Sequence, residues 1–352
     1  MPTNDYTLLE ILQQAVEAGA SDVHLHSGES LRLRVHGELQ KYGDGKLTEA
    51  TVRDLLSQLV AAESLSRLDS TGQIDFSATV PGLARFRGSA YRQRRGMDLV
   101  LRIVPAEAPS LENLGLPKSL AALTRHHQGL VLISGPSGCG KTSTLAALVD
   151  LINRERPEHV ITLEDPVEIV HRSRQCFVHQ RQIGRHSESF ANALRAALRE
   201  DPDVIVVGEL RDLETISLAL TAAETGHLVF GTLHTGGAVQ TIHRLVGVFP
   251  ADEQDHIRVM LSESLLAIVS QRLARRADGC GRVAALEILM ANQAIGNMIR
   301  TDKTFQIESV LQRGASDGMI LMEESLRSLV RDGTIEPSEA ARHSRTSGIS
   351  GG

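Results

Sequence analysis

The sequence contains no tryptophan, and aromatic residues make up only 3% of its 352 residues. Proteins that hold single-stranded nucleic acid stack bases on aromatic side chains, so this scarcity argues against such a platform. A net charge of −6 at pH 7 argues in the same direction, because nucleic-acid-binding surfaces are basic. The local basic run from Arg85 to Arg95 is better explained by a solvated sheet face or a subunit contact than by a polyanion site.

Cysteine is scarce too, and the three residues Cys139, Cys176 and Cys280 form no CxxC pair. A structural zinc site or a disulfide framework is therefore not expected, and the compartment is expected to be reducing. No apolar run approaches the ~20 residues of a membrane span. The first residues lack the basic and apolar regions of a signal peptide. We expect a cytoplasmic protein, which leaves room for docking on a membrane-embedded partner.

The length predicts two domains, at ~150 residues per domain. The first domain is expected over residues 1–105. Apolar residues at helical spacing from Leu8 onward predict a helix there, and Gly19 is its natural end. A second helix is expected over Val52–Leu68. Segments in which apolar and polar residues alternate, as in half-buried strands, lie before and after these helices in the sequence, which indicates an α+β domain. A linker rich in proline follows at 106–117.

After the linker, short apolar strands alternate with amphipathic helices, which is typical of a parallel α/β sheet. The strands expected there are "GLVLIS", "HVITLE", "DVIVVGE" and "HLVFGTL". We expect an α/β core over 118–290, a helical region over 291–343 and a disordered tail over 344–352.

The stretch "GPSGCGKT" matches the phosphate-binding pattern GxxxxGK[ST] in full, between a predicted strand and a predicted helix. Small residues let backbone N–H groups and the helix N-terminus face the phosphates. Lys141 would reach the β/γ-phosphates, and the Thr142 hydroxyl would bind Mg²⁺. Cys139 is interpreted as a small filler. The expected nucleotide-binding residues are Gly135, Pro136, Ser137, Gly138, Cys139, Gly140, Lys141, Thr142 and Ser143.

Hydrolysis also needs a carboxylate near the metal and a group that orients water. Glu209 and Glu164 each close a predicted strand, where α/β sheets place their ligands. We assign Glu209 to the Mg²⁺ side and Glu164 to the attacking water, and the reverse assignment stays open.

Three arginines are candidates for contact with a nucleotide. Arg195 and Arg199 are four residues apart on one face of a predicted helix, and Arg211 follows Glu209 closely. An arginine that reaches the γ-phosphate of a neighbouring subunit is worth about 10³–10⁵ in rate. A solvated or salt-bridged side chain is the alternative for each of them.

His227 and His234 flank the apolar run of the last strand. A zinc site needs three or four ligands, and none lies nearby at ligand spacing. Seven residues along a straight strand place the two side chains on opposite faces, so their roles should differ unless the chain bends at Gly231. Contact with the phosphates and plain core packing both remain open.

Together these segments resemble the secretion-type ATPases of type IV pilus and type II/IV secretion machines, most of all the PilT-type twitching-motility (pilus retraction) ATPases. The resemblance runs from Ala20 to about Ile335. It rests on four boxes, "GPSGCGKT", "ITLEDPVEIVH", "EDPDVIVVGELRD" and "TGHLVFGTLHT".

This resemblance implies a PAS-like N-terminal domain, a RecA-like ATPase domain with a helical C-terminal part, and ATP and Mg²⁺ as cofactors. It also implies a homohexamer that retracts pili at the platform protein of the inner membrane, with the linker as hinge. The last box is the family's His box, so the resemblance places His227 and His234 near the γ-phosphate as sensors.

The long N-terminal region and four-cysteine zinc site of pilus-assembly relatives are not found in this sequence, which favours the retraction branch. One stretch departs from the retraction pattern: "AIGNMIRT" has Gly296 where the family has Arg and Thr301 where it has Glu. An accessory retraction or secretion-type paralogue is therefore an alternative. A RecA-like nucleic-acid translocase and a nucleotide-binding partner without hydrolysis are alternatives of other classes.

Overall fold

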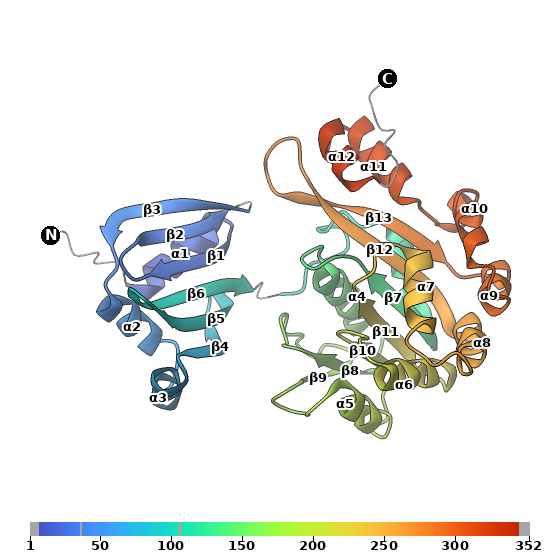
Figure 1. The fold of residues 1–352 in the computed structure, drawn as a ribbon, viewed down its shortest axis with the longest axis horizontal. Coiled ribbons are helices and arrows are strands. Elements are labelled where there is room, and N and C mark those ends of the chain that lie inside the picture. The colour runs from blue at the N-terminus through green and yellow to red at the C-terminus, as the bar shows by residue number, and fades with distance from the viewer. Residues whose placement is uncertain (1–6, 36, 105–106, 345–352) are drawn as a thin grey trace. The chain divides into compact units, whose positions relative to one another are not determined.

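The computed structural model of the chain describes residues 7–35, 37–104 and 107–344. The chain divides into two compact units between Glu107 and Ala108 (Figure 1). Each unit has its own sheet and its own hydrophobic core.

The first unit is a six-stranded antiparallel sheet of order β3-β2-β1-β6-β5-β4 with three helices. Its strands are β1 (Ala20–His26), β2 (Ser30–Val35), β3 (Glu38–Lys46), β4 (Gln73–Val80), β5 (Ala84–Gln93) and β6 (Gly96–Val104), and its helices are α1 (Leu8–Glu17), α2 (Glu49–Ser57) and α3 (Ala62–Thr71). Thr7 caps α1 by accepting from Glu10 N–H. Gly19 follows with φ 63°, a left-handed conformation that ends the helix.

Alternation along the strands puts apolar side chains on the helix-covered face of this sheet, where Leu12, Leu56 and Leu68 meet Phe86 and Leu99. The other face carries charge; there Arg102 donates to the buried carboxylate of Asp22 at 2.9 Å. The basic run 85–95 begins within β5, and its arginines alternate with buried residues.

The helix expected over Val52–Leu68 is wrong, because the segment forms two helices. Leu59 and Val60 both donate to the Leu56 carbonyl in a tight turn, and Ala61 is extended at φ −70°, ψ 160°. This break turns the chain so that the second helix also buries a leucine, Leu68, in the same core.

The second unit is built on a seven-stranded sheet of order β13-β12-β7-β11-β10-β8-β9. The strands are β7 (Gly129–Ser134), β8 (His159–Glu164), β9 (Phe177–Gln182), β10 (Val204–Val207), β11 (Leu228–Leu233), β12 (Leu265–Arg275) and β13 (Arg282–Met290). All neighbouring pairs are parallel except β12 and β13. The four predicted strands are confirmed as β7, β8, β10 and β11, the last two slightly shorter than expected.

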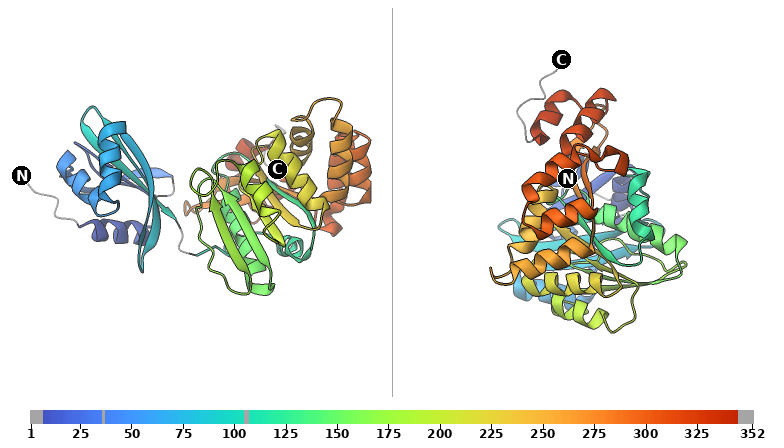
Figure 2. Two further views of the ribbon diagram at one scale, coloured as in Figure 1. Left: turned by 90° about the horizontal axis from the view of Figure 1, so that it is seen from below. Right: turned by 90° about the vertical axis from the view of Figure 1, so that its right-hand side faces the viewer.

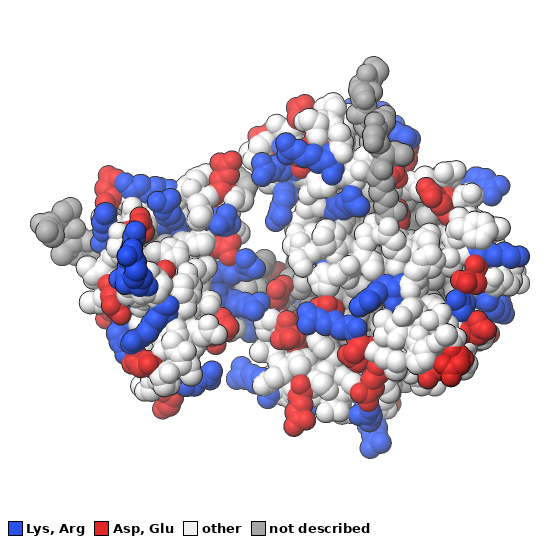
Figure 3. All heavy atoms as spheres, viewed as in Figure 1, with Lys and Arg blue, Asp and Glu red and all other residues white. Residues whose placement is uncertain are grey.

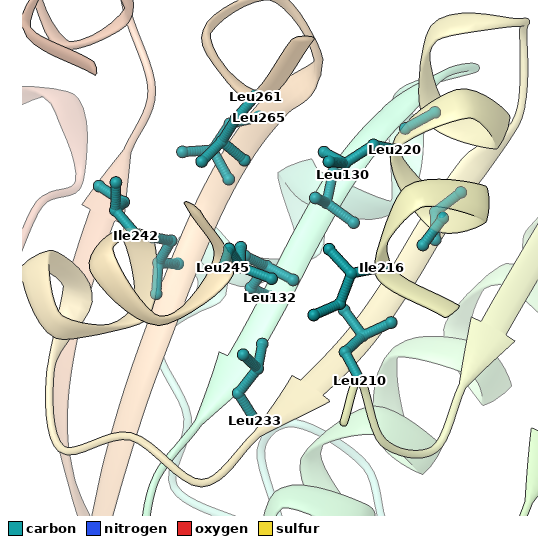
Figure 4. Close-up of a cluster of buried hydrophobic side chains, with 14 of the residues drawn as sticks. Leu130, Leu132, Leu210, Ile216, Leu220, Leu233, Ile242, Leu245, Leu261 and Leu265 are labelled. Atoms are coloured by element: carbon teal, nitrogen blue, oxygen red, sulfur yellow. The ribbon is translucent and has the colours of Figure 1, made fainter. Parts of the chain in front are cut away.

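Helices cover both faces of this sheet (Figures 1 and 2). One face packs on α5 (Phe190–Ala197), α6 (Leu213–Glu224), α7 (Ala238–Val246) and α8 (Gln254–Ser264). Figure 4 shows leucines of β7, such as Leu130 and Leu132, interleaved there with Ile216 and Leu245. The other face packs on α4 (Lys141–Glu155) and the short helix η1 (Lys118–Arg125). Both faces of β7, β8, β10 and β11 are therefore buried, which explains their continuous apolar sequences.

Of the predicted linker 106–117, residue 106 lies outside the described residues, and Leu111 and Leu116 pack into the core of the second unit. The C-terminal region is helical, as expected, and consists of η2 (Thr304–Gln306), η3 (Gly314–Asp317), α9 (Gln293–Arg300), α10 (Ile307–Leu311), α11 (Met322–Arg331) and α12 (Pro337–His343). The expected disordered tail lies, apart from Ser344, outside the described residues. Within them, no helix is long and apolar enough to cross a membrane.

Candidate nucleotide site

The phosphate-binding pattern forms a loop between β7 and α4, as the sequence predicts. Three of its glycines have positive φ, with Gly135 at 145°, Gly138 at 75° and Gly140 at 90°. A Cβ on Gly135 would lie 2.4 Å from the backbone carbonyl oxygen of Gln271, so no larger residue fits. Helix α4 begins directly after the loop, at Lys141, and Thr142 is exposed on its first turn. The loop and this helix N-terminus form a site for an anion.

Lys141 is buried within the loop that it serves. Its ammonium donates to the carbonyls of Gly135 at 2.8 Å and Pro136 at 3.1 Å, and Nζ lies 3.3 Å from Nδ1 of His234. Burial lowers the pKa of Lys141, while the negative charge of Glu209 opposes that shift. The ammonium therefore lies among acceptors that a phosphate oxygen can replace.

His234 joins this lysine to the carboxylate of Glu209. Its Nε2 lies 3.3 Å from Oε1 of Glu209. The same oxygen, Oε1, also accepts a hydrogen bond from Nε of Arg211 at 2.6 Å. An ammonium only donates, so Nδ1 of His234 accepts and Nε2 carries the proton toward the carboxylate. Lys141, His234, Glu209 and Arg211 thus form one continuous polar chain at the ends of β7, β11 and β10.

The charges within this polar chain of four side chains keep Glu209 ionised. Burial alone would raise the pKa of Glu209, but the hydrogen bonds from Arg211 and His234 and the positive charge of Arg211 outweigh burial and lower it. The hydrogen bond to Glu209 also raises the pKa of Arg211. A carboxylate that stays ionised is suited to the cation side of a nucleotide site.

Glu164, at the end of β8, has a different environment. Its Oε1 accepts from the Thr162 hydroxyl at 2.6 Å and from Nε2 of Gln180 at 2.9 Å. Burial raises the pKa of Glu164, and these hydrogen bonds only partly oppose it. A carboxylate with raised proton affinity is suited to accept a proton.

The structure separates the two histidines of the last strand. His227 precedes β11 and its Nδ1 lies 3.0 Å from the carbonyl of Ala222 near the end of α6. A span of seven residues at about 3.3 Å each puts it roughly 23 Å from His234. Within one chain His234 lies beside the phosphate loop, whereas His227 contacts the end of α6; a sensor role for either histidine stays a prediction.

Arg195 lies in α5, whereas Arg199 lies in the turn that follows this helix, so the expectation of one shared helix face is wrong; both side chains are exposed. Arg195 forms an ion pair with Glu214 and donates to the side chain of Asn192 at 3.1 Å. Of the three candidate arginines, only Arg211 touches the polar chain at the loop.

Cys139 fits its interpretation as a filler. The side chain is buried, and burial raises the pKa of its thiol, which makes it a poor nucleophile. Among the described residues, no cluster of three or more His, Cys, Asp or Glu side chains has the arrangement of a metal site.

Residues of β12 and β13 complete the surroundings of the loop, and the sequence did not point to them. Gln271 donates to the Cys139 carbonyl and accepts from the Thr144 hydroxyl. A cavity of about 400 Å³ lies beside Pro136–Cys139 and is also lined by Arg272, Arg282 and His343. Figure 3 shows basic side chains gathered over this hairpin. The signal was the apolar run "LLAIVSQRLAR", which is long enough for a strand but lacks a flanking motif.

The chain is similar to known proteins over most of its length. The family model described as "Type II/IV secretion system protein" matches residues 4–348. A "Twitching motility protein" of Neisseria gonorrhoeae is 48% identical over 315 residues, 90% of this chain and 84% of the relative. A "Type IV pilus retractation ATPase PilT" of Pseudomonas aeruginosa is 45% identical over 333 residues, 95% of this chain and 96% of the relative.

A solved structure, the "Pilus Retraction Motor PilT and Bound ADP", superposes with a TM-score of 0.88 at 44% identity and covers 97% of this chain and 98% of that chain. The similarity thus extends over both units and includes a protein whose title reports bound ADP. The chain therefore belongs to the type II/IV secretion system protein family, as an ATPase of its twitching-motility branch.

Proposed function

We propose that this chain is the ATP-hydrolysing motor subunit of a type IV pilus retraction machine. The observation that carries the proposal is the polar chain Lys141–His234–Glu209–Arg211, which joins the phosphate loop to the ends of two further strands. Loss of a γ-phosphate beside Lys141 would change the charge next to His234. That change would pass to β10 and β11, and so to the body of the sheet.

Each residue has a role in this proposal. The loop residues 135–140 and the first turn of α4 bind the phosphates. Thr142 and Glu209 hold Mg²⁺, which neutralises phosphate charge when bound. Glu164 positions the attacking water and accepts its proton, because its pKa is raised. Arg199 is exposed and would be available to a neighbouring subunit's nucleotide, whereas Arg195 would first have to leave its ion pair with Glu214.

At the level of assembly, we infer that the first unit is PAS-like, the second RecA-like, and the working form a homohexamer. The predicted linker 106–117 would act as the hinge. The ring would dock on the inner-membrane platform protein from the cytoplasmic side and use each ATP to remove pilin from the fibre base. The similarity to named retraction proteins over both units supports this reading.

An accessory retraction paralogue is a second candidate, and a specific observation favours it. Gly296 lies where retraction enzymes have Arg, and a Cβ there would be only 3.0 Å from the carbonyl oxygen of Ser262. Helix α9 therefore packs on α8 at a distance that suits glycine. This contact between α8 and α9 would therefore have to change if the family's arginine stood at 296.

Deletion of the gene in its host, with twitching and surface pili scored, separates these functions. Abundant static pili in the deletion strain would support the retraction motor, provided that the parent gene restores twitching and the Lys141→Ala gene does not. Loss of pili would indicate an assembly role and refute the proposal, whereas an unchanged phenotype would favour the accessory paralogue. Stimulation of phosphate release many-fold by DNA or RNA would instead support a nucleic-acid translocase.

A further inference from the structure

Gln271 is a buried amide that joins strand β12 to the phosphate loop and to α4. Its side chain is 2% exposed. Nε2 donates to the Cys139 carbonyl oxygen at 2.6 Å, and Oε1 accepts from the Thr144 hydroxyl at 3.0 Å. Both polar ends of the amide are therefore used, one on the loop and one on the helix that follows it.

The contact with Cys139 fixes the direction of a peptide group in the loop. In a trans peptide the C=O and the next N–H point in opposite directions, and the only cis bond among the described residues is Asp165–Pro166. With the Cys139 carbonyl held toward β12, the N–H of Gly140 points away from β12. Phosphate loops bind through N–H groups that converge on the anion, and a reversed peptide would present a carbonyl oxygen instead.

The glycines beside the Cys139–Gly140 peptide make its orientation easy to reverse, so another group has to fix that orientation. Gly138 and Gly140 flank Cys139, both with positive φ, and glycine populates both signs of φ at little cost. Gln271 also packs tightly here, since a Cβ on Gly140 would lie 3.2 Å from its Nε2. A hydrogen bond from a rigid, buried strand therefore selects one orientation of a flexible loop.

The residue type at 271 is also constrained. The Thr144 hydroxyl donates to Oε1, which leaves the NH₂ group facing Cys139. Glutamate would accept from Thr144 equally well but would set an oxygen against the Cys139 carbonyl. Methionine has similar length and no donor.

We propose that Gln271 is a positioning residue of the nucleotide site, which holds the Cys139–Gly140 peptide in the orientation that binds phosphate. The inference rests on the proposed function of the loop as an ATP site and adds a residue from outside the four sequence boxes. It also makes β12 the element that sets the shape of the loop.

The test compares the parent chain with Gln271→Glu, Gln271→Met and Ser270→Ala. Ser270 is a matched control because it lies next in the strand, is equally buried, and shares a 2.6 Å hydrogen bond with Ser134 outside the loop. The dissociation constant for a fluorescent ADP derivative is measured for each, together with the melting temperature without ligand and kcat and KM for ATP.

Both Gln271 variants are expected to bind ADP at least tenfold more weakly than the parent, with KM rising more than kcat falls. Ser270→Ala should stay within twofold in affinity although it loses a buried hydrogen bond. If Gln271→Glu does not fold, Gln271→Met, which introduces no charge, carries the test.

A folded Gln271 variant that binds ADP within twofold of the parent would overturn the inference. An equal loss of affinity in Ser270→Ala would overturn it as well, because the effect would then reflect general loosening of β12. Failure of the parent chain itself to bind ADP would refute the nucleotide site as a whole, and is thereby distinguished from failure of Gln271 alone.

Discussion

Replacement of His234 by alanine should separate nucleotide binding from hydrolysis. The imidazole connects Nζ of Lys141 with Oε1 of Glu209, at 3.3 Å on each side. Its loss leaves Lys141 with two carbonyl partners and Glu209 with Arg211. The loop that binds phosphate stays formed, while the link between the phosphate and β10 is cut.

The magnitudes follow from exposure and geometry. The His234 side chain is 40% exposed, so the free energy of unfolding should change by no more than about 0.5 kcal/mol. Removal of one preorganised hydrogen-bond donor from a catalytic site typically costs about 10²–10³ in kcat. We expect kcat for ATP to fall by about 10²-fold, with ADP affinity within about threefold of the parent.

Two further variants identify which contact matters. Glutamine at 234 keeps a donor near the position of Nε2, whereas asparagine keeps an acceptor near the position of Nδ1. If the contact with Glu209 carries the effect, His234→Gln should recover more activity than His234→Asn. Phosphate release and binding of fluorescent ADP are measured on the same preparations. A kcat of His234→Ala within twofold of the parent would refute the reasoning, as would a tenfold loss of ADP affinity with kcat unchanged.

Three other replacements test other parts of the structure. His227→Ala removes a half-buried hydrogen bond at the end of α6. It should lower the free energy of unfolding by about 1 kcal/mol and leave ATP hydrolysis nearly unchanged. Loss of hydrolysis at an unchanged melting temperature would instead support the sensor role that the sequence suggested. Glu164→Gln should abolish hydrolysis and raise the melting temperature at pH 8. Burial raises the folded-state pKa of Glu164, so its stabilising contribution is present at acid pH and lost as pH rises through that pKa; a melting temperature below that of the parent at pH 8 would contradict this sign. The parent's kcat/KM should likewise fall on acidification through the raised pKa of Glu164, and the pH–rate profile measures it. Gly296→Arg, which restores the family residue, should cost about 1–3 kcal/mol by overpacking α9 against Ser262, and an unchanged melting temperature would show that the helices move apart freely.

Much of the site could be predicted because it is local in sequence. The loop, its lysine and the following helix are contiguous in sequence, and the glycines of the motif indicate where the backbone needs positive φ. Glu164 and Glu209 could be placed together because parallel strands bring their carboxyl ends to one edge of the sheet. The broken helix at 58–61 was not predictable from its leucines, because the leucines on both sides of the break keep an apolar pattern.

The sequence by itself determined the phosphate loop, the order of strands and helices around it and the carboxylates at the strand ends, since each depends on neighbouring residues and on a fixed periodicity. Only the tertiary structure decided which histidine meets the loop and which residue holds it in shape. His227 and His234 lie in the same motif but at opposite ends of β11. Gln271 reaches Cys139 from 132 positions away, through the pairing of β12 with β7. Such a pairing is set by the packing of the whole sheet, and no local pattern in the chain encodes it.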